Sequence, residues 1–190
     1  IATYGEINTW DVSLITDMSN LFQDKYSFNE NLSNWDVSNV TDMSRCFSEA
    51  IEFDGDISTW DVSNVTDMYA MFLKSNFNGD VSNWDVSNVT NFGSMFEQTP
   101  LFNSDLSSWN VSGANYMDYM FYDALSFNIN ISDWNVFNVT NFNNILTNTS
   151  LSETNKYLIH QNSDFSSNAT WPYDWSNFSP YSGPWYVSIS

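Results

Sequence analysis

Acidic and amide side chains recur at one position of the sequence, directly after a tryptophan. In chain order the six members of this ladder are Asp11, Asp36, Asp61, Asp85, Asn110 and Asn135. Aspartates stacked on neighbouring strands repel one another unless cations lie between them or nearby groups donate hydrogen bonds. Calcium prefers oxygen ligands, so Asp36, Asp61 and Asp85 are its candidate ligands here. The sequence has no EF-hand loop and no glycine-rich calcium repeat, which favours hydrogen bonds from Ser and Asn instead.

Enzyme chemistry has little support in these residues. His160 is the only histidine, so a histidine-based triad would need a nucleophile from the irregular end of the chain. Cys46, the only cysteine, occupies the repeat position that Leu21 and Met71 occupy, which indicates a core residue. Carboxylate pairs recur with the repeat, as scaffold residues do, and no phosphate loop or zinc spacing is present. We therefore expect no catalytic residue, no cofactor other than a candidate calcium ion, and no enzyme.

The elements that position the ladder come from a repeat of about 25 residues. Six tryptophans mark it, at spacings of 25, 25, 24, 25 and 25 residues: Trp10, Trp35, Trp60, Trp84, Trp109 and Trp134. Around Trp35 the chain alternates apolar and polar residues over 34–38, which is typical of a short half-buried strand. The apolar residues of 40–50 then follow a helical period, with Thr41 as the expected N-cap.

One such unit cannot bury its own apolar face, so neighbouring units must stack. The predicted fold class is α/β, a leucine-rich-repeat-like solenoid. It has six short strand–helix repeats with a parallel strand ladder, and an irregular, aromatic-rich C-terminal cap. Residues 1–150 form the six-repeat solenoid, and residues 151–190 form a C-terminal capping helix and an aromatic tail.

The repeated phrase FNxDLSxWDVSNVTDMxxMF resembles the repeat of BspA-like leucine-rich-repeat surface proteins. The resemblance covers roughly residues 4–150 and rests on six recurrences of the phrase. It implies an extracellular protein, exposed on a cell or particle surface, that serves adhesion or protein contact, and it implies no catalytic residues.

The last 30 or so residues are rich in aromatic residues and proline and lie outside the repeat. They are interpreted as a wrapped cap. A second hypothesis makes them an assembly contact, because residues 185–190 alternate like a strand that could pair with an open edge of another molecule. Head-to-tail repetition of that contact would give a filament. The candidate contact residues are Trp171, Trp175, Trp185, Tyr186, Val187 and Ile189.

Charge limits the partners. The formal net charge is −19, with 23 acidic residues against four basic ones, which argues against nucleic acid. No apolar run is long enough for direct membrane insertion, so protein partners, self-assembly, a glycan or a cationic partner remain. Ten Asn-x-Ser/Thr triplets are candidate glycosylation sites if the protein is secreted: Asn31, Asn39, Asn64, Asn88, Asn110, Asn130, Asn138, Asn148, Asn168 and Asn177.

Two classes of function follow. The leading hypothesis is an extracellular or surface module for adhesion or protein–protein assembly, with head-to-tail filaments as one form of that assembly. It uses the ladder as its binding face and the aromatic tail as an intersubunit contact. The alternative is a calcium-, small-ligand- or glycan-binding solenoid. Ice binding is the weaker variant, because the face carries charge and most threonines are expected to cap helices.

Overall fold

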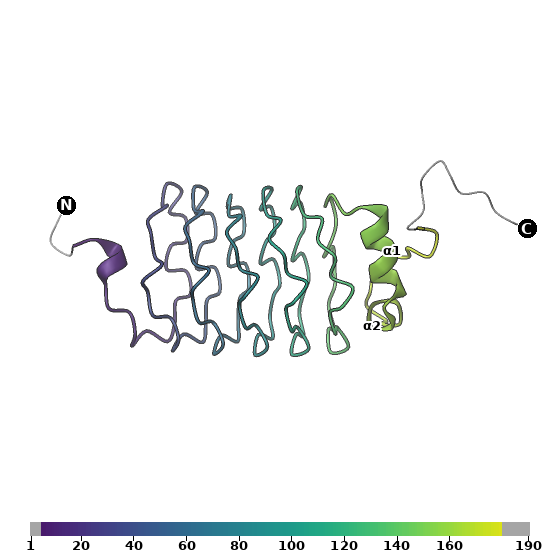
Figure 1. Ribbon diagram of the computed structural model, residues 1–190, viewed down its shortest axis with the longest axis horizontal. Helices are drawn as coiled ribbons and strands as arrows, with labels where there is room; N and C mark the ends of the chain where they lie inside the picture. The colour runs from purple at the N-terminus through teal and green to yellow at the C-terminus, as the bar shows by residue number, and fades with distance from the viewer. Residues whose placement is uncertain (1–4, 180–190) are drawn as a thin grey trace, which may run out of the picture.

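The chain winds into coils that stack along the long axis of the molecule. The computed structural model describes residues 5–179. One short 3-10 helix, η1 (Ile7–Thr9), lies at the N-terminal end of the stack, and α1 (Glu153–Gln161) and α2 (Ser163–Ser166) lie at the other end (Figure 1). Within residues 5–179 these are the only helices, and none is long and apolar enough to cross a membrane.

Neighbouring coils are held in a fixed register by isolated parallel bridges. The bridges join one residue per coil, and in order these residues are Asp17, Asp42, Asp67, Asn91, Tyr116 and Asn141. Their spacing follows the tryptophan spacing of the sequence, including the one shorter unit. Each coil is therefore one repeat.

The predicted strands and helices are wrong. Residues 5–179 contain no β-strand and no sheet, only the isolated bridges, so the fold is not an α/β solenoid with a parallel strand ladder. The backbone N–H of Trp35 donates to Leu32 O (3.0 Å) and that of Val40 to Val37 O (2.9 Å), both in turns of the same coil. Amides used in this way cannot pair with the next coil, so no strand ladder forms. Trp35 and Val37 are nevertheless buried and Asp36 is exposed, as the alternation in the sequence predicts.

The segments expected to be helices are runs of turns. In every coil two non-glycine residues, four apart, have positive φ, and they are Asn20 and Asp24, Arg45 and Glu49, Ala70 and Lys74, Ser94 and Gln98, Tyr119 and Asp123, and Asn144 and Asn148. An α-helix cannot pass through left-handed residues. The apolar spacing of three that suggested a helix comes instead from turns closed by i to i−3 hydrogen bonds, such as Cys46 N to Met43 O (3.1 Å).

These turns send alternate backbone amides to the next coil. In the second coil the N–H groups of Met43, Arg45, Phe47 and Glu49 donate to carbonyls of the third coil at 2.7 to 3.0 Å. The same four positions repeat the pattern at each of the five junctions between coils. One edge of this segment is therefore a row of N–H groups, and the opposite edge is a row of carbonyls.

Side chains connect the remaining parts of the coils. Thr41 was expected to cap a helix, but its hydroxyl donates to Thr16 O (3.2 Å) in the preceding coil, as does its backbone N–H (2.8 Å). Thr66 and Thr90 repeat this arrangement. These three threonines therefore link neighbouring coils instead of capping helices.

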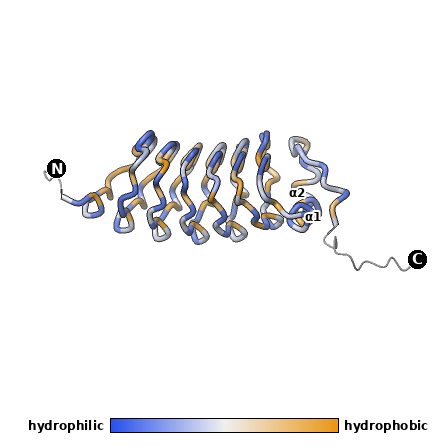
Figure 2. Tube along the Cα trace, turned by 90° about the horizontal axis from the view of Figure 1, so that it is seen from above, coloured by the Kyte–Doolittle hydropathy of each residue, from blue (hydrophilic) through white to orange (hydrophobic). Residues whose placement is uncertain are grey.

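Aromatic columns fill the interior. The ring of Phe72 stacks between Phe47 (5.7 Å between centroids) and Phe96 (5.6 Å). From the second coil to the sixth, the indole N–H of the repeat tryptophan donates to a carbonyl of the preceding coil, for example Trp84 Nε1 to Ile57 O (3.2 Å). Every coil thus places a hydrophobic stretch inside and hydrophilic stretches outside, an alternation seen along the tube in Figure 2.

The C-terminal end of the stack is covered. Ser152 accepts from Asn155 N (3.2 Å) and caps α1, in the segment where the sequence predicts a capping helix. The fully buried ring of Phe165, in α2, packs near Phe142 of the last coil. Tyr173 Oη accepts the backbone N–H of Leu146 (3.0 Å), one of the last coil's outward donors.

Candidate functional site

The acidic ladder lies on one exposed side of the stack, and its members bind neighbouring residues of their own coil. Asp36 Oδ1 accepts both the backbone N–H of Ser38 (3.1 Å) and its hydroxyl (2.6 Å). Asp11 and Asp61 hold Ser13 and Ser63 in the same way, and Asn110 holds Ser112. In the fourth coil Asp85 accepts from Ser87 N, and in the sixth Asn135 accepts from Phe137 N. The ladder is therefore a set of side-chain-closed turns.

These bonds stabilise the ionised carboxylates. The Ser38 hydroxyl and then its backbone N–H lower the pKa of Asp36 below its ordinary value, and the charge of Asp11 opposes the effect weakly. The pKa values of Asp11 and Asp85 are lowered by Ser13 and Ser87 in the same manner. Hydrogen bonds thus offset the repulsion that had suggested a bridging cation.

A group with a lowered folded pKa contributes stability above its ordinary pKa and loses it as pH falls through the folded value. We therefore expect the variant Asp11→Asn, Asp36→Asn, Asp85→Asn to lose less stability than the wild type when thermal melts are compared between pH 6 and pH 2.5. Asparagine keeps the oxygen acceptor, as Asn110 shows, and does not titrate.

A matched variant separates this effect from net charge. Asp24, Asp118 and Asp133 changed to Asn remove the same three charges, and among the described residues these aspartates accept no hydrogen bond from a serine two positions on. Equal acid sensitivity of the two triple variants would contradict the role of the Asp–Ser bonds.

The described residues form no cluster of side chains that could hold a metal ion. Across residues 5–179 no three His, Cys, Asp or Glu side chains converge on one point, so Asp36, Asp61 and Asp85 do not surround an ion. Cys46 is fully buried, and burial raises the pKa of its thiol far above the usual range. Nδ1 of His160 is buried in the cap without a hydrogen-bond partner.

Most candidate glycosylation amides are already engaged. The side-chain amides of Asn39, Asn64, Asn88 and Asn138 donate to a carbonyl of the preceding coil at 2.8 to 2.9 Å. Asn148 donates to Asp123, and Asn168 donates to both Val136 O and Val139 O. Asn31, Asn110 and Asn130 instead use Oδ1 to accept from the residue two positions on, while Asn177 is exposed. The repeated triplet therefore has a structural use in the stack.

The candidate assembly residues of the tail divide into two groups. Trp171 and Trp175 belong to the cap, where the Trp171 ring meets Phe142 edge-on (5.2 Å between centroids) and Trp175 is buried. Trp185, Tyr186, Val187 and Ile189 lie outside the described residues.

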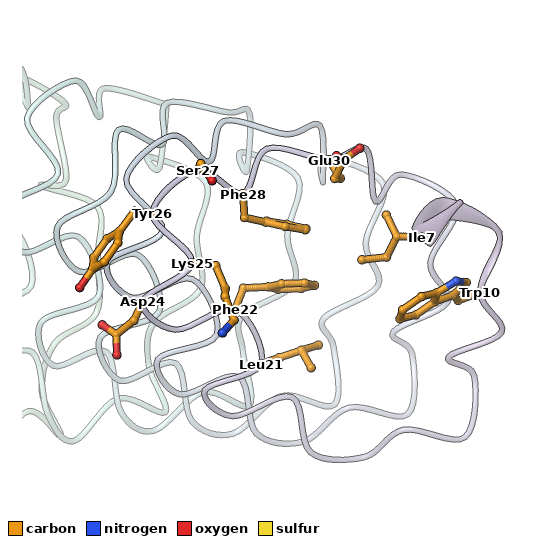
Figure 3. Close-up of a pocket in the computed structure, with 10 residues that line it drawn as sticks. All are labelled: Ile7, Trp10, Leu21, Phe22, Asp24, Lys25, Tyr26, Ser27, Phe28 and Glu30. Carbon is orange, nitrogen blue, oxygen red and sulfur yellow. The ribbon is translucent and has the colours of Figure 1, made fainter. Parts of the chain in front are cut away.

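The sequence did not indicate one surface with exposed apolar side chains, the outward side of the first coil. We call it the N-terminal face. Its apolar residues line a hollow of about 760 Å³ together with Asp24, Lys25, Ser27 and Glu30 (Figure 3), and they are Ile7, Trp10, Leu21, Phe22, Tyr26 and Phe28. Trp10 is 44% exposed, whereas Trp35 at the same position of the next coil is 5% exposed. Leu21 is 45% exposed, whereas Cys46 is fully buried. At these two positions the face therefore presents side chains whose second-coil counterparts are buried.

The repeat pattern gave no signal for this face, because Trp10 and Leu21 stand at repeat positions that are buried in the second coil. Core residues are exposed where neither a neighbouring coil nor a cap covers them. At the other end Tyr173 and α2 supply that cap. Among the described residues only η1, three residues long, lies at the N-terminal end.

Comparison with known proteins places the chain in a family. Residues 2–75 and 70–160 match the family described as Mycoplasma protein of unknown function, DUF285. The chain belongs to the DUF285 family. Membership is consistent with the resemblance to BspA-like surface repeat proteins. No curated protein and no solved structure matches the chain, so for this DUF285 member the arguments about function rest on the geometry.

Proposed function

We propose that the chain is an extracellular or surface-exposed contact module that binds other polypeptides, in adhesion or in assembly, and is not an enzyme. One observation carries the proposal: the N-terminal face leaves Trp10 and Leu21 nearly half exposed, while the opposite end of the stack is covered. Apolar side chains gathered at one place on a surface are typical of a contact site.

Two further features support this reading. The repeated residues form turns, coil-to-coil bonds and the core, so the repeat itself supplies a scaffold. The repeated phrase resembles the repeat of BspA-like surface proteins, and that resemblance implies a surface protein that serves adhesion or protein contact. The acidic ladder supports a second surface for cationic partners, since Asp11, Asp36 and Asp85 are exposed and hydrogen bonds from serines lower the pKa of each.

The test compares two leucines of similar exposure. Leu21 is on the N-terminal face and is 45% exposed; Leu101 is on a lateral edge of the stack and is 53% exposed. Beads coated with wild type, Leu21→Asp or Leu101→Asp are applied to a panel of immobilised proteins, with circular dichroism as the check on folding. We expect Leu21→Asp to lower binding at least tenfold, because it places a charge in the apolar contact, and Leu101→Asp to bind like wild type.

An equal loss in both variants would move the contact away from the N-terminal face. No binding by the folded wild type to any polypeptide surface would contradict the contact function itself.

A further inference from the structure

The N-terminal face carries a second feature besides its apolar residues. The backbone carbonyls of Asp17, Ser19, Leu21 and Gln23 form a row along its edge, which we call the carbonyl row. At the next coil the equivalent carbonyls, from Asp42 to Ser48, accept the N–H groups of Met18, Asn20, Phe22 and Asp24 at 2.8 to 2.9 Å. Within residues 5–179 no donor reaches the carbonyl row itself.

The carbonyl row is unipolar because of the positive-φ residues. Asn20 (φ 59°) and Asp24 (φ 60°) alternate with right-handed neighbours, and this alternation turns successive peptide groups the same way. A partner edge must therefore offer N–H groups at every second residue, with no carbonyls between them.

A β-strand does not meet that requirement. The edge of a strand presents N–H and C=O groups in turn, so half of its groups would face carbonyls across the junction. Wherever two carbonyls face each other in the contact, neither has a donor, and the free energy of removing both groups from water weakens binding.

A second copy of the chain does not meet it either. Two N-terminal faces brought together would oppose carbonyl to carbonyl. In each copy the C-terminal cap lies against the last coil: Tyr173 Oη already accepts Leu146 N, one of the four N–H groups of that edge, and the rings of Phe165 and Trp171 pack against Phe142. A second copy could reach this edge only if the cap moved away.

We propose that the N-terminal face is a docking site for one class of partner, a polypeptide coil of the same repeat that presents an uncovered N–H edge. Such a coil continues the junction already made five times inside the stack. It covers Trp10 and Leu21 with apolar residues, gives four donors to the carbonyl row, and accepts the N–H groups of Thr16 and Ser27, as Thr16 O and Tyr26 O accept those of Thr41 and Glu52. This inference rests on the proposed contact function and names the partner's chemistry.

The test places that coil next to the face. A copy of residues 29–53 is inserted directly before residue 4 of the full chain, which aligns the copied Met43, Arg45, Phe47 and Glu49 with the carbonyl row. We expect the midpoint of thermal unfolding to rise by about 5–10 °C, since one more junction is formed. Hydrogen exchange at Thr16 and Ser27 should slow at least tenfold, because both amides become bonded.

The matched control carries Arg45→Pro and Glu49→Pro in the copied coil only. Proline has no N–H and cannot adopt positive φ, so the control keeps the apolar residues of the copy but loses two donors and the alternating backbone. We expect neither the rise in midpoint nor the slower exchange. A second extended protein, with a copy of residues 54–77, guards against a defect peculiar to one copied sequence.

Three outcomes decide the matter. A gain in an extended protein without a gain in the proline control supports the proposal. An equal gain in the proline control overturns it, because any apolar cover would then suffice. No gain from either copy also overturns it, and if Leu21→Asp still abolishes bead binding, the contact function stands with a partner of different chemistry.

Discussion

Replacing Phe72 with alanine is expected to lower the free energy of unfolding by about 3–5 kcal/mol. The ring is fully buried in the middle of the stack and touches aromatic rings of three coils: Phe47 in the second, Phe77 at the end of its own and Phe96 in the fourth. Removing it leaves a cavity between coils that are fixed in place by four backbone bonds at each junction, so the neighbours cannot collapse to fill it. Chemical denaturation followed by tryptophan fluorescence measures the change.

The control for this prediction is Phe137→Ala. Phe137 is 78% exposed on the ladder side of the last coil, so its removal is expected to change stability by less than about 0.5 kcal/mol. Similar losses for Phe72→Ala and Phe137→Ala would show that the aromatic column does not hold the coils together.

Ala70→Val is expected to destabilise the chain by about 2–4 kcal/mol, although it adds only two methyl groups. Ala70 has φ 53° and is fully buried, and its N–H donates to Gly93 O (2.8 Å) in the next coil. A left-handed conformation costs an L-residue about 1–2 kcal/mol, more for a β-branched one, and overpacking adds about 1–3 kcal/mol.

Ala70→Gly is the matched variant, because glycine adopts positive φ without strain. We expect it to lie within about 1 kcal/mol of wild type in the same denaturation experiment. If valine were tolerated as well as glycine, the turn segment could not depend on the left-handed backbone that the structure assigns to Ala70.

The register of the stack could be predicted from sequence, but its local structure could not. The tryptophan spacing gave the repeat, and the alternation around Trp35 gave the correct buried and exposed sides. A helix was inferred for residues 40–50 because turns closed by i to i−3 bonds also bury every third residue. Asn20 and Asn144 are types that tolerate positive φ, but Arg45, Ala70 and Lys74 occupy the same positions and give no such signal.

The two candidate surfaces also differ in how far they could be predicted from the sequence. The ladder could be located from Asp36 and its equivalents, and its turns were within reach of sequence reasoning because Ser38 follows at the spacing an aspartate-closed turn needs. The N-terminal face could not be found in this way. Leu21 occupies the same repeat position as the buried Cys46 and Met71, so its type and spacing do not indicate that it is exposed.

The backbone of the turn segments also gives the stack a dipole along its long axis. At each junction four backbone N–H groups point toward the capped end, and between one and three point the other way. Peptide dipoles that add along an axis leave partial positive charge where the N–H groups point and partial negative charge at the opposite end. This polarity is opposite to that of an α-helix running in the same direction as the chain. The N-terminal face therefore has a negative electrostatic potential from the backbone. This potential favours approach of a partner with its positively charged side toward the face, before any side chain makes contact.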